Sequence, residues 1–317
     1  MTKRAFTFPG QGSQAVGMGK DLAEAFAEAR AVFAEVDDAL GQKLSALMFD
    51  GPDDALRLTE NAQPALMAVS VAVTRVLASR GVSLKDHADF VAGHSLGEYS
   101  ALAAAGTFSL ADAARLLRIR GEAMQKAVPV GQGAMAAILG LDVATVARAA
   151  ADAAQAEVCA VANDNAPGQV VISGHVAAVN RAMEALKALG AKRALPLPVS
   201  APFHCALMQP AADRMAEALA AVDMQAPVVP LIANVLATPI SDPAEIRRRL
   251  VEQVTGVVRW TDCVGWLVGA GGVTQLVELG TGKVLTGLAK RIAPDAEALA
   301  LNSPADIEAF AAAVTGA

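Results

Sequence analysis

A serine set between two glycines is the first candidate for chemistry in this sequence. The segment Gly93-His94-Ser95-Leu96-Gly97 fits the pattern Gly-x-Ser-x-Gly. In that pattern the serine lies on a sharp turn between a strand and a helix, and its hydroxyl is exposed as a nucleophile. A five-residue match also arises by chance in a glycine-rich chain. The hypothesis of a nucleophilic Ser95 therefore requires a base and a binding site elsewhere in the sequence.

Histidine is the usual base for a serine nucleophile, and the chain contains four histidines. His87 lies in a polar loop and His175 heads a predicted helix, so both are predicted to lie at the surface. His94 adjoins Ser95, but neighbours on a sharp turn point in different directions, so His94 is predicted to line the pocket. By elimination, His204 is the predicted base.

The third member of a catalytic triad is harder to find. An α/β-hydrolase carries an Asp or Glu between its serine and its histidine in the sequence. Here that interval is mostly a separate subdomain, whose acidic residues are predicted to lie at its surface. A backbone or amide carbonyl can orient the imidazole instead, because the task requires only an acceptor for its N–H. The sequence therefore departs from an ordinary esterase.

One arginine falls on the apolar face of a predicted helix that begins at Ser109. That face is formed by Ala113, Leu116, Leu117, Met124 and Ala127, and Arg120 occupies the same stripe. A buried guanidinium keeps its charge and requires an anion. The partner is either a protein carboxylate such as Glu98 or Glu122, or a carboxylate that arrives with the substrate and is held by two parallel hydrogen bonds.

The composition limits the class of protein that presents these residues. The chain has 317 residues, of which 54% are hydrophobic and 18% are charged, which indicates a well-buried globular core. The net charge of −6 argues against nucleic acid as a partner. Apolar runs interrupted by charges predict no membrane span. The three cysteines are odd in number, which favours a reducing cytoplasm over a disulfide framework.

Short apolar runs alternate with amphipathic helices, which is typical of an α/β fold. A strand at 5–8 ends at a glycine-rich turn, and a second strand at 90–92 enters the serine turn, from which a helix over 97–105 leaves. Helices are also predicted over 21–40 and, as a buried element, over 63–80.

The pattern changes between residues 129 and 199. Strands and helices there follow the order β-α-β-β-α-β, which is the ferredoxin-like unit. Prolines mark both ends of this segment. We therefore predict a hydrolase-like core with a parallel sheet, formed by residues 1–128 and 200–317, and interrupted by a ferredoxin-like subdomain over 129–199. A cleft between the two parts is a common place for a substrate.

Four motifs occur in the order seen in one family. They are Phe8-Pro9-Gly10-Gln11-Gly12-Ser13-Gln14, Gly93-His94-Ser95-Leu96-Gly97-Glu98, Arg120-Gly121, and Ala166-Pro167-Gly168-Gln169-Val170-Val171-Ile172-Ser173-Gly174. Over essentially its whole length the sequence resembles the malonyl-CoA:acyl carrier protein transacylases. The resemblance implies a hydrolase-like core with a ferredoxin-like insert, in agreement with the pattern of elements.

The resemblance also implies roles for individual residues. Ser95 corresponds to the nucleophile and His204 to its base. The backbone N–H groups of Gln11 and Leu96 correspond to the oxyanion hole. Gln253 corresponds to the residue whose carbonyl orients the histidine, which accounts for the missing acid.

Substrate contacts are implied in the same way. Arg120 corresponds to the clamp on the malonyl carboxylate. Asn163, Asn165 and Gln169 are placed near the acyl or CoA site, and Asn165 is the preferred asparagine. Phe203 resembles the bulky residue of malonyl-selective members, where methylmalonyl-selective members carry a smaller side chain.

The implied reaction is a ping-pong transfer from malonyl-CoA to the phosphopantetheine thiol of an acyl carrier protein, with no metal or redox cofactor. Because the carrier is expected to be acidic, docking requires a local basic patch, for which Lys192-Arg193 and Lys290-Arg291 are candidates. Three alternatives stay open: an acyltransferase serving a polyketide synthase, a serine hydrolase that releases malonate, and a non-catalytic module that binds the carrier.

Overall fold

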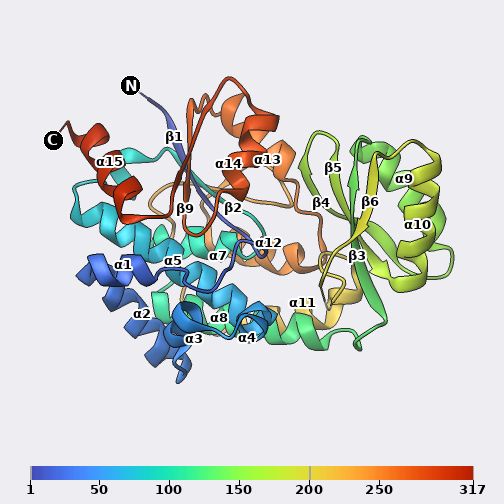
Figure 1. Cartoon of the computed structure of the whole chain (residues 1–317), viewed down its shortest axis with the longest axis horizontal. Coiled ribbons are helices and arrows are strands. Elements are labelled where there is room, and N and C mark those ends of the chain that lie inside the picture. The colour runs from blue at the N-terminus through green and yellow to red at the C-terminus, as the bar shows by residue number, and fades with distance from the viewer. Residues whose placement is uncertain (1, 200, 317) are drawn as a thin grey trace.

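A six-stranded sheet forms the centre of the larger part of the molecule. The computed structural model describes residues 2–199 and 201–316 (Figure 1). The sheet consists of β1 (Arg4–Phe8), β2 (Phe90–Gly93), β7 (Leu231–Ile232), β8 (Pro239–Ile240), β9 (Gln275–Leu279) and β10 (Glu297–Leu301). Its spatial order is β10-β9-β1-β2-β7-β8, and all neighbours are parallel except β8, which runs antiparallel to β7.

Alternate residues of the central strands enter two separate cores, because successive side chains of a strand point to opposite faces. Phe6 and Phe8 of β1 pack into the larger core. Ala5 of β1 packs into a smaller core with α13 and α14. Parallel strands covered on both faces are the arrangement expected of an α/β protein.

The helices of the larger part cover both faces of this sheet (Figure 1). They are α1 (Lys20–Ala25), α2 (Ala27–Leu40), α3 (Leu44–Asp50), α4 (Asp53–Arg57), α5 (Thr59–Ser79), α6 (Leu84–His87), α7 (Gly97–Ala104), α8 (Leu110–Lys126), the 3₁₀ helix η1 (Ala206–Met208), α11 (Gln209–Ala220), α12 (Pro243–Thr255), α13 (Trp260–Val268), α14 (Val284–Ile292) and α15 (Pro304–Thr315). The single helix predicted over 21–40 is wrong: Phe26 adopts an extended conformation, with φ −126°, and separates α1 from α2.

The second part is a four-stranded antiparallel sheet with two helices, which lie on the side away from the core (Figure 1). Its elements are β3 (Gly133–Leu139), α9 (Val143–Ala154), β4 (Cys159–Ala166), β5 (Gln169–His175), α10 (Val176–Ala188) and β6 (Arg193–Pro196), and the sheet order is β4-β5-β3-β6. The predicted fold class, a parallel α/β core interrupted by a ferredoxin-like unit, is confirmed. The domain boundaries at 129 and 199 stay predictions, and residue 200 lies outside the described residues.

Strand β4 ties the insert to the core. The backbone N–H of Asp164 donates to the carbonyl of Val258 at 3.0 Å, and the N–H of Val258 donates to the carbonyl of Ala162 at 2.9 Å. At the β4–β5 turn, the guanidinium of Arg291 on α14 donates to the carbonyl of Pro167 at 2.8 Å and to the side chain of Gln169. These contacts fix β4 at the edge of the cleft.

Helix α5 is the one helix in the described part of the chain that is long and apolar enough to cross a membrane. Its 21 residues are mostly buried against the other helices and the sheet of the core. The helix is therefore a core helix of this fold.

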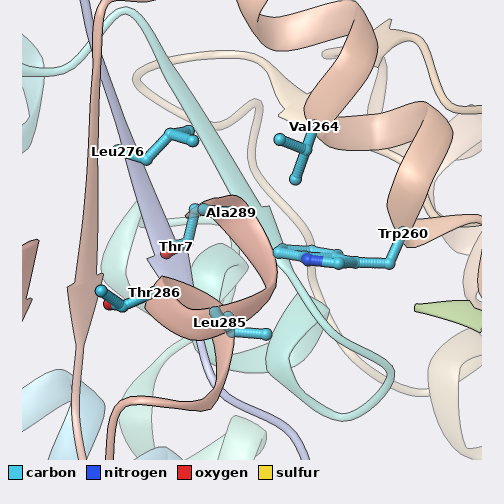
Figure 2. Close-up of a pocket in the computed structure, with 7 residues that line it drawn as sticks. All are labelled: Thr7, Trp260, Val264, Leu276, Leu285, Thr286 and Ala289. Atoms are coloured by element: carbon cyan, nitrogen blue, oxygen red, sulfur yellow. The ribbon is translucent and has the colours of Figure 1, made fainter. Parts of the chain in front are cut away.

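A small internal cavity lies between the sheet and the helices α13 and α14. Figure 2 shows its lining, with Trp260 extending from α13 toward α14. Its volume of about 10 Å³ is on the order of one water molecule. This cavity is too small for an organic substrate, so the substrate site must lie elsewhere.

Candidate active site

Ser95 occupies a strained turn at the carboxyl end of β2. Its φ of 53° lies in the left-handed region, which a residue with a Cβ rarely adopts. The turn is possible because Gly93 and Gly97 leave room: a Cβ on Gly93 would lie 1.9 Å from the carbonyl carbon of Gly97, and one on Gly97 would lie 2.3 Å from the carbonyl oxygen of Phe8. The turn places the serine hydroxyl at the amino-terminal end of α7.

His204 joins Ser95 from the loop between the insert and η1. Ser95 Oγ and His204 Nε2 are 2.7 Å apart, and His204 Nδ1 lies 2.9 Å from the backbone carbonyl oxygen of Gln253. A carbonyl only accepts, so Nδ1 carries the proton and Nε2 is free to accept the serine proton. A backbone carbonyl therefore occupies the position at which an acid residue is usual.

Burial and the nearby Arg120 cation lower the pKa of His204 to about 3. The imidazole is thus neutral across the physiological range. A neutral imidazole beside a hydroxyl can act as a general base.

Two backbone N–H groups lie at the same edge of the sheet. β1 and β2 are parallel neighbours, so the loops that follow them, with Gln11 and with Leu96, leave the sheet side by side. Within the described residues, the N–H groups of Gln11 and Leu96 donate to no protein acceptor. Free N–H groups beside a nucleophile can stabilise an oxyanion.

Arg120 on α8 is 1% exposed, as its place on the apolar stripe predicts. Its Nη1 donates to Gln63 Oε1 at 2.9 Å, and its Nη2 donates to Gln253 Oε1 at 2.8 Å and to Ser95 Oγ at 3.2 Å. Within residues 2–199 and 201–316 it forms no ion pair, and Glu122 pairs with Lys126 instead. The guanidinium is positioned by two neutral amides, and its charge is left without a counter-ion.

Glu98 does not bond to Arg120 directly, because the side-chain amide of Gln253 lies between them and bonds to both. Burial raises the pKa of the Glu98 carboxyl to about 8, against the lowering effect of hydrogen bonds from Asn234 and Gln253. Glu98 is therefore not the ion-pair partner considered for Arg120.

A cavity of about 300 Å³ opens onto these groups. Among its lining residues are Gln11, Gln63, His94, Ser95, Leu96, Arg120, Asn163, Asn165, Phe203 and His204. Apolar walls are added by Met124, Met135, Leu197 and Val199. Charged and polar groups thus meet at Ser95 inside a partly apolar pocket, which is the usual form of a small-molecule site.

His94 and Asn165 form one side of this cavity. His94 Nε2 lies 2.8 Å from Asn165 Oδ1, and the His94 ring packs 5.5 Å from the ring of Trp260. Burial lowers the pKa of His94. His94 therefore lines the cavity and bonds to Asn165, whereas the histidine that bonds to Ser95 Oγ is His204.

Gln169 does not line this cavity. It lines a separate groove with Arg291 and Lys192, on the other side of β4. Successive residues of β4 alternate, so that Asn163 and Asn165 line the Ser95 cavity whereas Asp164 between them lines the groove. The structure thus separates Gln169 from the two asparagines with which the sequence grouped it.

Two residues of this site were absent from the sequence prediction. Gln63 is a polar residue inside the apolar helix α5, the same signal that singled out Arg120. Asn234 follows the short strand β7, whose carboxyl end lies beside that of β2. Its side chain accepts from the N–H of Ser95 at 2.8 Å and donates to the carbonyl of Gly93 at 2.7 Å.

A hydroxyl bonded to a neutral imidazole, beside free N–H groups and an unpaired guanidinium, is equipped for acyl transfer involving an anionic acyl group. The fold and site define an α/β enzyme of the serine acyl-transfer class. A family model described as "Acyl transferase domain" matches residues 5–264, and the chain belongs to this family.

Individual relatives agree over the full length. The chain is 51% identical to "Malonyl CoA-acyl carrier protein transacylase" of Salmonella typhimurium, covering 98% of this chain and 99% of the relative. It is 58% identical to the crystal structure of an acyl-carrier-protein S-malonyltransferase from Bartonella henselae, with a TM-score of 0.97 and full coverage of both chains. It is 46% identical, with a TM-score of 0.95 and full coverage of both chains, to a malonyl-transacylase solved in complex with a type II polyketide synthase acyl-carrier protein.

The lowered pKa of His204 predicts an unusual pH dependence. An ordinary histidine loses its base form below pH about 6.5, and its reactivity would fall roughly tenfold by pH 5.5. Because His204 stays neutral, labelling of Ser95 by a neutral fluorophosphonate should keep the same rate from pH 7.5 to pH 5.5. The rate is measured by intact-protein mass spectrometry, with Ser95→Ala as the unlabelled control. A titration of the rate with a midpoint near 6.5 would contradict this assignment.

Proposed function

We propose that this chain transfers a malonyl group from malonyl-CoA to the phosphopantetheine thiol of an acyl carrier protein in fatty-acid synthesis. The observation that carries the proposal is Arg120, a buried cation without a carboxylate partner in the described chain, 3.2 Å from the candidate nucleophile. A malonyl group differs from an acetyl group by the carboxylate that such a guanidinium binds. The malonyl transacylases among its full-length relatives support the same substrate.

In the first half-reaction, Ser95 Oγ attacks the thioester carbonyl and its proton passes to His204 Nε2. The N–H groups of Gln11 and Leu96 hold the oxyanion, and each donor contributes roughly 3–4 kcal/mol to the transition state. The C–S bond then breaks, and the CoA sulfur leaves with the proton from His204. The product is a malonyl ester of Ser95.

In the second half-reaction, the carrier thiol enters the same cavity and gives its proton to His204. Its sulfur attacks the ester carbonyl, and the oxyanion forms again between the same donors. Ser95 Oγ leaves and recovers the proton from the imidazole. The backbone carbonyl of Gln253 keeps His204 in the required tautomer throughout.

Phe203 is 8% exposed and lines the Ser95 cavity next to His204. We propose it as the residue that limits the acyl group to malonyl. We also propose a cytoplasmic location, the compartment in which free thiols such as Cys159, Cys205 and Cys263 persist.

Arg120→Ala tests the role of the unpaired cation. A bidentate charged contact in a partly dry pocket is worth about 2–5 kcal/mol, so acylation of Ser95 by malonyl-CoA should fall roughly 30- to 4,000-fold. Acylation by acetyl-CoA should fall far less. Adduct formation is followed by mass spectrometry of the peptide that contains residues 91–100.

The control is Arg118→Ala on the same helix, because Arg118 bonds to Gln42 away from the cavity. An unchanged malonyl-to-acetyl ratio in Arg120→Ala means that the arginine is structural. A malonyl adduct that persists in Ser95→Ala, on Cys205 or another serine, overturns the nucleophile assignment. Rapid release of free malonate by the wild type without carrier favours the hydrolase alternative.

The docking surface for the carrier is proposed at the groove on the other side of β4. This groove of about 810 Å³ is lined by Lys192 and Arg291, one residue from each predicted basic pair, and also by the carboxylates of Asp142, Asp164 and Asp262. Lys192, Arg193, Lys290 and Arg291 are all exposed. Asp164 of β4 lines this groove, and its neighbours Asn163 and Asn165 line the Ser95 cavity, so a carrier bound there would lie next to the strand that borders the cavity.

Reversal of Lys192, Arg193 and Lys290 to Glu should raise the KM for the carrier severalfold and leave self-acylation by malonyl-CoA unchanged, because steering charges act on the encounter. Arg291 is kept, since its guanidinium also holds the β4–β5 turn. The control is Lys85→Glu, at the opposite edge of the sheet. If the triple variant and the control have the same carrier KM, the carrier docks elsewhere.

A further inference from the structure

A buried carboxyl group stands behind the site and takes no part in the proposed mechanism. Glu98, in the first turn of α7, is 2% exposed. One of its oxygens accepts the backbone N–H of Asn234 at 2.7 Å, and the other accepts the side-chain N–H of Gln253. An acid that is buried this deeply is retained only where its oxygens are used.

The two partners of Glu98 are the residues that hold the reacting groups. Asn234 bonds to both sides of the strained turn, at the carbonyl of Gly93 and the N–H of Ser95. Gln253 donates to the carbonyl of Ser95 at 2.8 Å and accepts from Arg120 at 2.8 Å. The Glu98 carboxyl thus bonds both to Asn234, which holds the turn at Ser95, and to Gln253, which holds Arg120.

The orientation of the Gln253 amide depends on Glu98. Its nitrogen must face Ser95 O and Glu98 so that its oxygen can face Arg120. Both oxygens of Glu98 accept from N–H groups, which is the arrangement of its ionised form, the form that predominates above its pKa of about 8. An amide nitrogen in place of one oxygen cannot accept. An acid at position 98 therefore acts with the Ser95 carbonyl to hold the nitrogen of the Gln253 amide, so that its oxygen meets the guanidinium.

We propose that Glu98 is a positioning residue that sets malonyl selectivity by fixing the side-chain amide of Gln253 against Arg120. The inference rests on the proposed function, since selectivity requires that Arg120 bind the acyl carboxylate. It assigns to Glu98 an effect on one acyl group over another, which general support of the fold does not produce.

Glu98→Gln is the test. The backbone N–H of Asn234 cannot rotate, so the new amide keeps its oxygen there and turns its nitrogen toward Gln253. Two N–H groups then face each other, so the Gln253 amide loses its acceptor at position 98 and is held only by the Ser95 carbonyl and Arg120. A less firmly held acceptor for the charged Arg120 should lower malonyl acylation roughly ten- to hundredfold more than acetyl acylation.

Glu278→Gln is the matched control. Glu278 is also a buried carboxyl, 1% exposed, but it accepts from Leu285, Thr286 and no group of the site. It should lose stability by thermal unfolding while keeping the wild-type ratio of malonyl to acetyl acylation. The single-turnover rates of Ser95 acylation are measured for the wild type and both variants.

A folded Glu98→Gln with the wild-type ratio, or with both rates lowered equally, overturns the proposal. If this variant does not fold, Glu98→Asp keeps both acceptors but withdraws them by one methylene, and the same change in ratio is expected. A folded Glu98→Asp with the wild-type ratio also overturns the proposal. Failure of wild-type Ser95 to prefer malonyl-CoA would refute the proposed function instead, whatever the variants do.

Discussion

Ser95 holds a backbone conformation with a φ of 53°, and most of the site follows from keeping it there. Such a conformation costs on the order of 1–3 kcal/mol and persists only where its surroundings determine it. The close packing of Gly93 on Gly97 and the bonds from Asn234 supply that support. The turn in return directs the hydroxyl to His204 and leaves the N–H of Leu96 unbonded.

In the candidate site, the guanidinium of Arg120 is a cation that is surrounded by neutral groups. Burial and the charge of Arg120 keep His204 neutral, so the proposed base can accept a proton without an acidic residue as its partner. A carboxylate in the place of Gln253 or Gln63 would supply Arg120 with a permanent counter-ion. The amides position the guanidinium but leave its charge for a ligand, which is how a site binds an anionic acyl group rather than a neutral one.

The fold and the candidate site differed in how far the sequence could predict them. The order of the insert elements and the burial of Arg120 follow from local periodicity, and both were predicted. The break at Phe26 was missed because α1 and α2 share one apolar pattern, and packing around Phe26 decides where it is interrupted. The separation of Gln169 from Asn165 depends on how β4 is held against the core, which involves Arg291 more than a hundred residues away in the chain.

Gln63 and Asn234 are two residues of the site that the sequence did not predict. Each lies far from Ser95 in the sequence. Asn234 reaches the site because β7 is the parallel neighbour of β2, and Gln63 reaches it because helix α5 borders the Ser95 cavity. A single polar residue in an apolar segment indicates a buried side chain that needs a hydrogen-bond partner, but the sequence does not indicate which residue that partner is. That information is tertiary.

We propose that Arg120 lacks a counter-ion in the described part of the protein because the acyl group provides one. A crystal structure of the malonyl-Ser95 enzyme, trapped in the absence of carrier, tests it most directly. Both oxygens of the acyl carboxylate should lie within roughly 2.7–2.9 Å of guanidinium nitrogens of Arg120. An acyl carboxylate directed instead toward Arg57, which also lines the cavity, with Arg120 bonded only to Gln63 and Gln253, would contradict this proposal.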